Sequence, residues 1–486
     1  MIEIMIDLQG GAKAPLYEKI YEHIKSEIME GKIRKGEKLP STRRLASNLA
    51  VSRSTVEMAY DQLLAEGYIQ AEPCRGFFVC DITELYHLEA KPLKSYTDEK
   101  RVQKDGYKID FSPYAIETRS FPYNIWRKIS KNVLLDDREE LLLAGDGQGE
   151  WELRTAIAGY LHQARGVNCG ASDIILGAGN EYLEILLSQL LGRDMTILME
   201  NPGYPQAYRT FSNMGYQVET VPAEETGLNV EVVRQKNPDL VYMMPSHQFP
   251  LGTVLPLKQR LELLKWASEA ENRYLIEDDH DSEYRYRGKP IPSLQSVDRY
   301  GKVIYLGTFS KSIAPSLRIS YMVLPPQLMK CYRDVCGFYS TTVPRMQQDI
   351  LREFIKAGHF ERHLNKMRGI YRGRHDFLLG ELKKRTWVRT VRGDHAGLHF
   401  LVEIDTCMGE QDICELALTH GVKVSGIRQY YLVEKRQAGM EDGKNCHTFP
   451  VLLLGYGKLT EDEIHTGLLV LDKILKEDKG EEENDL

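Results

Sequence analysis

The feature that most constrains the fold is a polar segment, residues 307–318, that lies between two apolar runs. The run before it, residues 302–306, is typical of a buried parallel strand, and a second such run, residues 319–324, follows it. From about residue 107 to residue 479, apolar strands alternate with helical patterns, which predicts an α/β fold with a mostly parallel sheet. The polar segment therefore follows the carboxyl end of a strand, where open α/β sheets bind ligands.

Lys311 lies in this segment among hydroxyl side chains, and Arg318 follows seven residues later. Thr308, Ser310 and Arg318 are suited to donate hydrogen bonds to an anion such as phosphate. A lysine amine at this place is also suited to form an imine with an aldehyde cofactor. On the segment alone, a solvated lysine in a polar loop explains the pattern equally well.

The preceding strand favours the cofactor. Residues 273–281 begin with an apolar run and end in a cluster of acids that includes Asp278. Pyridoxal 5′-phosphate (PLP) requires an imine-forming lysine, a phosphate cup, and a carboxylate that keeps its pyridine nitrogen protonated. We therefore predict a PLP site in which Lys311 is the catalytic residue and Asp278 faces the ring nitrogen.

Three segments, residues 244–250 (M-P-S-H-Q-F-P), 277–279 (E-D-D) and 307–318, together resemble the aminotransferase-like part of the MocR/GabR regulators, a branch of the bacterial GntR family. This resemblance implies a PLP-dependent body with the large and small domains of a fold-type I aminotransferase. It also implies a head-to-tail homodimer in which each DNA-binding head packs over the body of its partner.

The first eighty residues predict a DNA-binding head. Ser41 and Ser52 are good N-caps for two short helices joined by a tight turn, a helix-turn-helix, and two strands around residues 73–76 form a wing. Residues 32–53 contain seven basic side chains and one acid, although the whole chain has a net charge of −7. Such a local cluster is typical of contacts with DNA phosphates. The alternative is a small helical interaction domain whose charges are only solvated.

The string L-P-S-x-R followed by V-S-R-x-T-V closely resembles the GntR-type winged helix-turn-helix, which implies binding to operator DNA. We expect the start of the second helix to enter the major groove, the arginines before the turn to contact phosphates or a groove edge, and the wing tip to enter the minor groove. The predicted DNA-binding residues are Arg43, Arg44, Ser52, Arg53, Ser54, Thr55 and Arg75.

A strand at residues 174–176 leads into Gly179, Asn180 and Glu181 at the start of a helix, which predicts an anion cup built from backbone N–H groups. By resemblance, these three residues hold the PLP phosphate. Many relatives have glutamine where this chain has Glu181, so we expect the Glu181 side chain to point away from the phosphate.

The resemblance extends to further side chains. It implies that Tyr204 lies near the cofactor ring and the effector, and that His247 belongs to the region that reaches the ring oxygen. His280 replaces a tyrosine that hydrogen-bonds the ring hydroxyl, and histidine titrates near neutral pH. Arg428 is placed to bind the carboxylate of an effector. The alternatives are turn residues for Tyr204 and His247 and an exposed surface arginine for Arg428.

The 486 residues are too many for one core. We expect a winged helix at residues 12–81, a flexible linker at 82–106, the aminotransferase-like body at 107–479 and an acidic tail at 480–486. The eight cysteines form no C-x-x-C pair, and we expect no metal site. The N-terminus lacks the apolar core of a signal peptide and no apolar run is long enough to span a bilayer, so we expect a cytoplasmic protein without a membrane partner.

Three functions compete. The first is a transcription regulator that binds operator DNA and senses an amino acid or related amine by imine exchange at Lys311. The second is an active aminotransferase with an appended DNA-binding head, and the third is a DNA-binding dimer that has lost its cofactor. The presence of Lys311, Asp278 and Arg318 argues against the third function. The head argues against the second, because a metabolic enzyme has no use for a domain that recognises DNA sequence. We favour the first, with a residual aminotransferase half-reaction.

Overall fold

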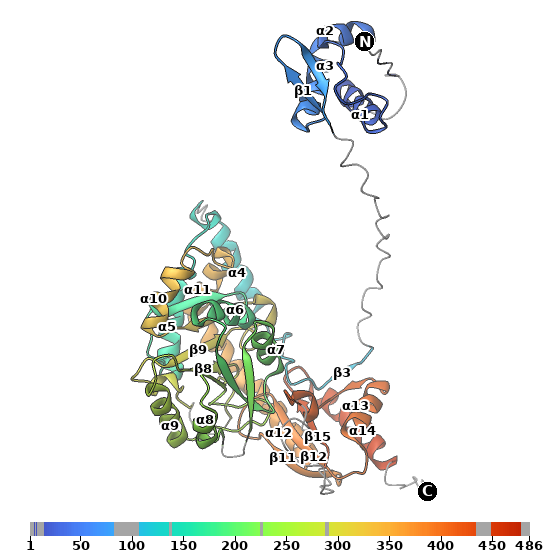
Figure 1. Cartoon of the computed structure of the whole chain (residues 1–486). Helices are drawn as coiled ribbons and strands as arrows, with labels where there is room; N and C mark the ends of the chain where they lie inside the picture. Colours follow the sequence, from blue (N-terminus) through green and yellow to red (C-terminus); the bar gives the residue numbers. More distant parts are fainter. Residues whose placement is uncertain are drawn as a thin grey trace. The chain divides into compact units, whose positions relative to one another are not determined.

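The computed structural model describes residues 4, 6, 14–81, 106–135, 139–223, 227–286, 291–433 and 449–477. The chain separates into two compact units, Met1–Lys104 and Asp105–Leu486, which we call the head and the body (Figure 1). The predicted linker, apart from Gly106, and the predicted acidic tail lie outside the described residues.

The head is a three-helix unit with a two-stranded wing. Its elements are α1 (Leu16–Met29), α2 (Thr42–Leu49), α3 (Arg53–Ala65), β1 (Ile69–Glu72) and β2 (Gly76–Val79). The wing strands pair antiparallel, with Ile69 opposite Val79. Its core is formed by side chains that recur on one face of each helix, namely Ile20, Ile24, Leu45, Val56, Tyr60 and Leu63.

Local capping explains where α2 and α3 begin. The Ser41 Oγ accepts a hydrogen bond from the Arg44 N–H at 3.3 Å, and the Ser52 Oγ accepts one from the Thr55 N–H at 3.2 Å. Between the helices, Ala50 adopts a left-handed backbone with φ of 53°, which produces the tight turn. Both predicted N-caps are therefore confirmed.

The large domain of the body is built on a seven-stranded sheet in the order β4-β10-β9-β8-β7-β5-β6. Side chains that alternate along β4 and β9 enter cores on opposite faces, as Ile304 and Tyr305 do, so these strands are apolar throughout. The strands are β4 (Ile174–Gly177), β5 (Thr196–Asn201), β6 (Gln217–Pro222), β7 (Leu240–Met243), β8 (Tyr274–Asp279), β9 (Val303–Thr308) and β10 (Ser320–Val323).

Helices and short 3-10 turns accompany this sheet, and the last of these helices, α12, extends to the smaller part of the body (Figure 1). The helices are α4 (Tyr123–Leu135), α5 (Trp151–Arg165), α6 (Asn180–Leu191), α7 (Pro205–Asn213), α8 (Val230–Lys236), α9 (Leu257–Ser268), α10 (Pro326–Val335), α11 (Arg345–Lys356) and α12 (His359–Leu382). The turns are η1 (Glu139–Leu142), η2 (Ala171–Asp173), η3 (Gln295–Val297) and η4 (Pro315–Leu317).

One strand direction differs from the prediction. The strand before the lysine segment, β9, runs parallel to β8 as predicted, but β10 runs antiparallel to both β9 and β4. The connection from β9 to β10 contains only the short turn η4 and no crossover helix. A parallel return requires a longer crossover, so the chain reverses direction instead.

A smaller sheet with the order β11-β12-β15-β14 forms the second part of the body. Its strands are β11 (Val388–Arg392), β12 (His399–Ile404), β14 (Ser425–Gly426) and β15 (Val451–Gly455), and a parallel pair is formed by β3 (Ile109–Asp110) and β13 (Val422–Lys423). The accompanying helices are α13 (Glu410–Thr419), η5 (Ile427–Tyr430) and α14 (Glu461–Glu477). Within the described ranges, no helix has the length and apolar character that crossing a membrane requires.

Candidate functional site

A small cavity of about 120 Å³ lies at the carboxyl ends of β8 and β9 and contains Lys311. We call it the Lys311 cavity. It brings together side chains that are far apart in the sequence, and most of the predicted cofactor-binding residues are among them. The lining residues are Tyr114, Asn180, Glu181, Tyr204, Met244, Phe249, Asp278, His280, Thr308, Ser310, Lys311, Arg318 and Ser320.

The Lys311 amine is enclosed by protein, and this burial lowers its pKa, although the carboxylates of Asp281 and Asp278 act in the opposite direction. Its backbone carbonyl accepts a hydrogen bond from the Tyr284 hydroxyl at 3.1 Å. The Nζ atom lies 6.0 Å from the centre of the Tyr114 ring. A lowered pKa enriches the neutral amine, which is the nucleophilic form of lysine.

Asp278 is the penultimate residue of β8 and is buried. Burial raises the pKa of its carboxyl to about 6, while the hydrogen bond donated by the Tyr242 hydroxyl acts in the opposite direction. The Asn180 Nδ2 donates a second, long hydrogen bond of 3.4 Å to the same carboxylate. Asp278 is therefore mostly ionised at neutral pH, and a cation beside it would favour the ionised form further.

An anion cup forms where β4 passes into α6. Gly179 is the N-cap of α6 with φ of 111°, a backbone conformation that favours glycine, and a Cβ atom there would lie 1.9 Å from the Arg318 Nη2 and displace the guanidinium. Arg318 donates to the Ala178 carbonyl at 3.3 Å. A helix N-terminus with a guanidinium beside it is suited to bind phosphate.

Glu181 differs from the expectation that it points away from this cup. Its Oε2 forms an ion pair with the Arg318 Nη2 at 2.7 Å, and both side chains are about half exposed. The Arg318 guanidinium, whose charge is opposite to that of Glu181, lies within reach of the first turn of α6. An anion in the cup would therefore compete with Glu181 for Arg318.

The hydroxyl groups beside Lys311 order the loop that carries it. The Thr308 Oγ1 accepts a hydrogen bond from the Ser310 N–H at 3.1 Å and from the Ser320 hydroxyl at 3.0 Å. These contacts hold the start of the loop against β10. Thr308, Ser310 and Arg318 all line the same cavity.

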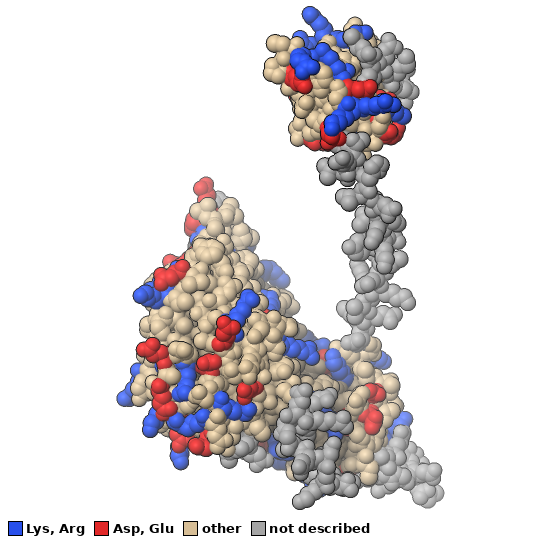
Figure 2. Space-filling view, viewed as in Figure 1, with Lys and Arg blue, Asp and Glu red and all other residues tan. Residues whose placement is uncertain are grey.

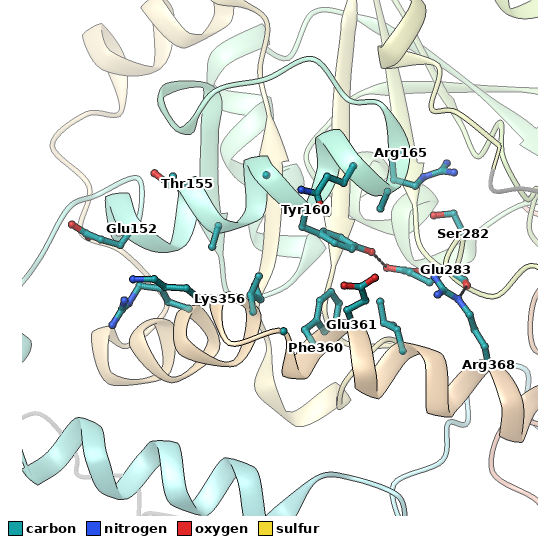
Figure 3. Close-up of a pocket in the computed structure, with 18 of the residues that line it drawn as sticks. Glu152, Thr155, Tyr160, Arg165, Ser282, Glu283, Lys356, Phe360, Glu361 and Arg368 are labelled. Atoms are coloured by element: carbon teal, nitrogen blue, oxygen red, sulfur yellow. Dashed lines mark hydrogen bonds between the residues drawn. The ribbon is translucent and has the colours of Figure 1, made fainter.

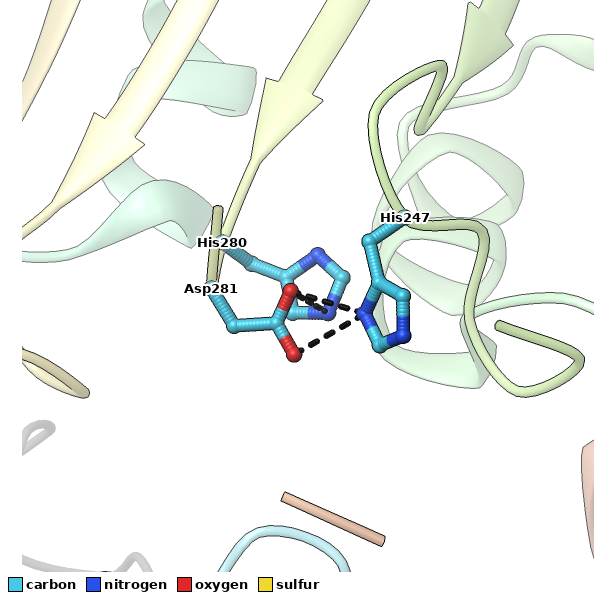
Figure 4. Close-up of side chains that lie close together, drawn as sticks. All are labelled: His247, His280 and Asp281. Carbon is cyan, nitrogen blue, oxygen red and sulfur yellow. Dashed lines mark hydrogen bonds and ion pairs between the residues drawn. The ribbon is translucent and has the colours of Figure 1, made fainter. Parts of the chain in front are cut away.

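His280 and His247 both lie against Asp281 (Figure 4). The His247 Nδ1 is 2.9 Å from the Asp281 Oδ1, and the His280 Nε2 is 3.4 Å from the same oxygen without forming a hydrogen bond. Burial lowers the pKa of His280 to about 3, so the expectation that this residue titrates near neutral pH is wrong. Although burial opposes it, the two imidazoles hold the pKa of Asp281 below its usual range.

The predicted DNA-binding residues lie at the start of α3, on α2 and at the wing. Arg43, Arg44, Arg53 and Arg75 are exposed, and Figure 2 shows basic side chains on the head. Arg53 forms an ion pair with Glu57 at 2.7 Å.

The hydroxyls that precede and begin α3 are occupied locally. The Ser52 Oγ lies 2.8 Å from the Ser54 Oγ and 2.7 Å from the Thr55 Oγ1. At the wing, Arg75 forms an ion pair with Glu72, and its guanidinium lies 5.2 Å from the centre of the Phe78 ring.

Two family descriptions match the chain. Residues 16–79 match bacterial regulatory proteins of the gntR family, and residues 113–437 match aminotransferase class I and II. The chain is 40% identical to the HTH-type transcriptional regulator YdeL of Bacillus subtilis over 93% of this chain and 95% of that protein. It is 31% identical to the probable rhizopine catabolism regulatory protein MocR of Rhizobium meliloti, covering 90% and 91% of the two chains.

This chain belongs to the MocR-type regulators of the GntR family. It is also 30% identical to the pyridoxine biosynthesis regulator PdxR of Corynebacterium glutamicum, over 96% of this chain and 97% of that one. The body has the aminotransferase fold, with a TM-score of 0.66 to Pyrococcus horikoshii kynurenine aminotransferase at 24% identity, covering 77% of this chain and 92% of that one. As a MocR-type regulator, the chain binds DNA and uses PLP as its cofactor.

The residues of the Lys311 cavity fit PLP. The His280 Nε2 and the Asn180 Oδ1 are buried polar atoms without a hydrogen-bond partner among the described residues, as expected where a polar ligand completes the site. Gly179 leaves space that any Cβ atom would fill. The amine, carboxylate and guanidinium of Lys311, Asp278 and Arg318 meet the three chemical requirements of the cofactor in one cavity.

Three predicted site residues, Gly179, His247 and Arg428, are not among the residues that line this cavity. Gly179 precedes the lining residue Asn180 as the N-cap of α6. His247 pairs with Asp281, and its ring lies 6.2 Å from that of His399. Arg428 lies on η5 with an exposed side chain, and its backbone N–H donates to the Glu410 Oε1 at 2.8 Å. Two residues further along η5, Tyr430 is buried, with its ring centre 6.4 Å from that of the cavity residue Tyr114.

Sequence reasoning missed four lining residues. Met244 and Phe249 belong to the segment that carries the resemblance, so a signal was present in the sequence. Ser320 opens β10 and faces Thr308 across the strand pair. Tyr114 lies between β3 and α4 outside any motif, and its ring packs 5.4 Å from Phe249 only because the chain folds back there.

Proposed function

We propose that this MocR-type regulator controls transcription by sensing a small amino compound at Lys311. The observation that carries the proposal is the Lys311 cavity itself, in which a buried amine, a buried carboxylate and an anion cup lie together in a chain that also has a DNA-binding head. When bound, PLP supplies an aldehyde carbon, and different amines compete to bond to that carbon.

In this proposal each residue of the cavity has one task. The backbone at Gly179, Asn180 and Glu181, with the Thr308 and Ser310 hydroxyls and the Arg318 guanidinium, would hold the phosphate. Asp278, ionised above a pH of about 6, would face the ring nitrogen, and the neutral His280 would donate to the ring oxygen. His247 would act through Asp281, which it orients.

The effector would compete with the Lys311 amine and place its remaining groups between Tyr204 and Arg428. Because Arg428 is exposed and outside the cavity, its guanidinium has to turn toward Tyr430 and Tyr114 to meet a carboxylate. Only a conformation of the body that allows Arg428 to contact the effector carboxylate is stabilised by that contact. The effector would thus shift a pre-existing equilibrium by its differential affinity, and the linker, residues 82–106, would pass the change to the head.

We propose further that two chains form a head-to-tail homodimer, so that two heads bind two half-sites of an operator. Large apolar side chains are exposed on α4, on and directly after η1, and after α10, and exposed apolar surface of this kind can mark a protein–protein interface. The loop after Phe338 contacts the segment that leads into the anion cup, because the Thr342 Oγ1 accepts a hydrogen bond from the Ala178 N–H at 3.1 Å. The exposed side chains are Leu134, Leu135, Leu142, Leu143 and Phe338.

A panel of amines and amino acids titrated into the purified holo-protein tests the sensing proposal. We expect one chemical class to change the absorption spectrum of the cofactor and the affinity for operator DNA at the same concentrations. A spectrum that responds without any change in DNA affinity contradicts regulation by this site. Sustained turnover of an amino donor with a keto acid at ordinary enzyme rates would favour an aminotransferase instead.

A further inference from the structure

The body contains a second and larger cavity, of about 760 Å³, between α5 and α12 (Figure 3). No residue lines both this cavity and the Lys311 cavity. Its walls combine aromatic rings, of which Tyr160 and Phe360 lie 5.1 Å apart, with carboxylates from Glu283 and Glu361. The volume lies in the range that small organic ligands occupy in proteins.

Residues that line the second cavity contact the segments that form the Lys311 cavity. Its wall residue Arg165 donates to the Asp279 carboxylate and to the Ser246 hydroxyl, each at 2.7 Å. Another wall residue, Phe360, packs 5.5 Å from Phe309, which is two residues before Lys311. The two cavities therefore share the packed segments between them.

Two carboxylates lie at one end of the second cavity, which we call the Glu283 end; Glu283 is partly buried and Glu361 is exposed. The Glu283 Oε1 accepts a hydrogen bond from the Tyr160 hydroxyl at 3.2 Å, and the Glu361 carboxylate points toward the same end (Figure 3). Burial, with the Asp279 charge, raises the pKa of Glu283 to about 7. Among the described residues, Glu283 and Glu361 form no ion pair.

The basic side chains that the structure describes in the wall of the second cavity do not pair with Glu283 or Glu361. Arg165 pairs with Asp279, and Arg352 pairs with Asp349 and Glu353. Lys356 is exposed at the other end of the cavity from Glu283 (Figure 3).

Arg368 is nearer to the Glu283 end, but it donates hydrogen bonds of 2.8 Å to the Glu283 backbone carbonyl and to the Asn365 side chain. It is therefore held against the wall. A partly buried carboxylate such as Glu283 is unfavourable without an ionic partner, and a cation from solution would relieve that cost.

We propose that the second cavity binds an organic cation, with its ammonium group between Glu283 and Glu361 and its apolar or aromatic part along Phe360 and Leu364. The face of the Tyr160 ring adds a cation–π contact at the charged end. Because Glu283 lies two residues from Asp281 and its charge acts on Lys311, the occupant also changes the electrostatics of the Lys311 cavity. The second cavity is thus a regulatory site distinct from the site of the amino effector.

Benzyltrimethylammonium is a suitable probe because its nitrogen carries no hydrogen and cannot react with the cofactor as an amine does. Calorimetric titration of the full-length holo-protein should give saturable binding with one site per chain. Glu283→Gln, which retains the size of the side chain, should weaken this binding by about tenfold or more. The matched control Glu152→Gln, at the exposed rim of the same cavity, should weaken it by less than about twofold.

Reduction of the holo-protein with borohydride fixes the cofactor on Lys311 and separates this proposal from the sensing proposal. Binding of the probe should survive reduction, whereas the response to the amino effector should be lost. Absence of saturable binding, equal binding by Glu283→Gln protein with wild-type thermal stability, or loss of binding after reduction would each overturn the second site. None of these results would affect the assignment of Lys311.

Discussion

The head and the Lys311 cavity place their charged side chains in opposite surroundings. Arg43, Arg44 and Arg53 project from the head into solvent, whereas Asp278 and Lys311 are enclosed in the cavity, where burial shifts the pKa of each. Exposed charges act at long range and are screened by salt, and enclosed charges are sensitive to protonation. We therefore expect salt to control DNA binding and pH to control cofactor binding, in one chain.

The largest effect expected is that of Lys311→Ala. Because the amine is the only lysine nitrogen among the residues that line the cavity, its removal should abolish the visible absorbance of the covalently held cofactor. Operator binding without effector should stay within about twofold of wild type, since the head has its own core. The exposed Lys258→Ala serves as the control and should keep the spectrum. Absorbance that survives in Lys311→Ala would mean that another lysine carries PLP.

A smaller effect is expected for Arg53→Ala, which removes an exposed cation at the start of α3, the predicted recognition helix. Operator affinity should fall by about tenfold and the dependence of affinity on salt should become shallower by about one unit of logarithmic slope. Glu57→Ala removes the partner of Arg53 in its 2.7 Å ion pair and should not weaken binding. Gel-shift titrations at several salt concentrations measure both variants, and an unchanged affinity for Arg53→Ala would remove the recognition-helix assignment.

The Lys311 cavity should respond to pH instead. Burial raises the pKa of Asp278 to about 6, so its ionised form, which the protonated ring nitrogen requires, decreases below that pH. Affinity for PLP should therefore fall by about tenfold for each pH unit below about 6. His280, with a pKa of about 3, stays neutral over this range and adds nothing to the profile. Asp278→Asn should bind PLP weakly and lose this step; a retained step would assign it to another group.

The sequence was sufficient for those parts of the molecule that are specified locally. Several features are each encoded within a few neighbouring residues: the N-caps Ser41 and Ser52, the strand ends at Asp279 and Thr308, and the glycine at the start of α6. For that reason the cavity residues between Thr308 and Arg318 could be named before any contact was known.

Long-range packing decided the rest. Tyr114 enters the Lys311 cavity through a ring contact with Phe249, and no local pattern marks it. The low pKa of His280 follows from burial, which the sequence does not specify. The second cavity depends on how α5 and α12 meet, so its acidic end at Glu283 could not be anticipated. The antiparallel β10 follows from the absence of a crossover helix, which a strand pattern alone does not reveal.

The smallest effect concerns the Arg318–Glu181 ion pair at the rim of the Lys311 cavity. Its exposure is intermediate between that of the charges on the head and that of the charges inside the cavity. The Arg318–Glu181 pair is about half exposed on both sides, so it should behave like a surface ion pair, which contributes at most about 1 kcal/mol. Glu181→Gln frees the guanidinium for the phosphate and should tighten PLP binding by about two- to fivefold, with the gain reduced at high salt. In an Arg318→Ala background the same substitution should change the affinity little, because the competing partner is gone. Spectroscopic titration of apo-protein with PLP in the four variants of this cycle measures the coupling; weaker binding by Glu181→Gln would mean that its carboxylate supports the cup rather than competing with it.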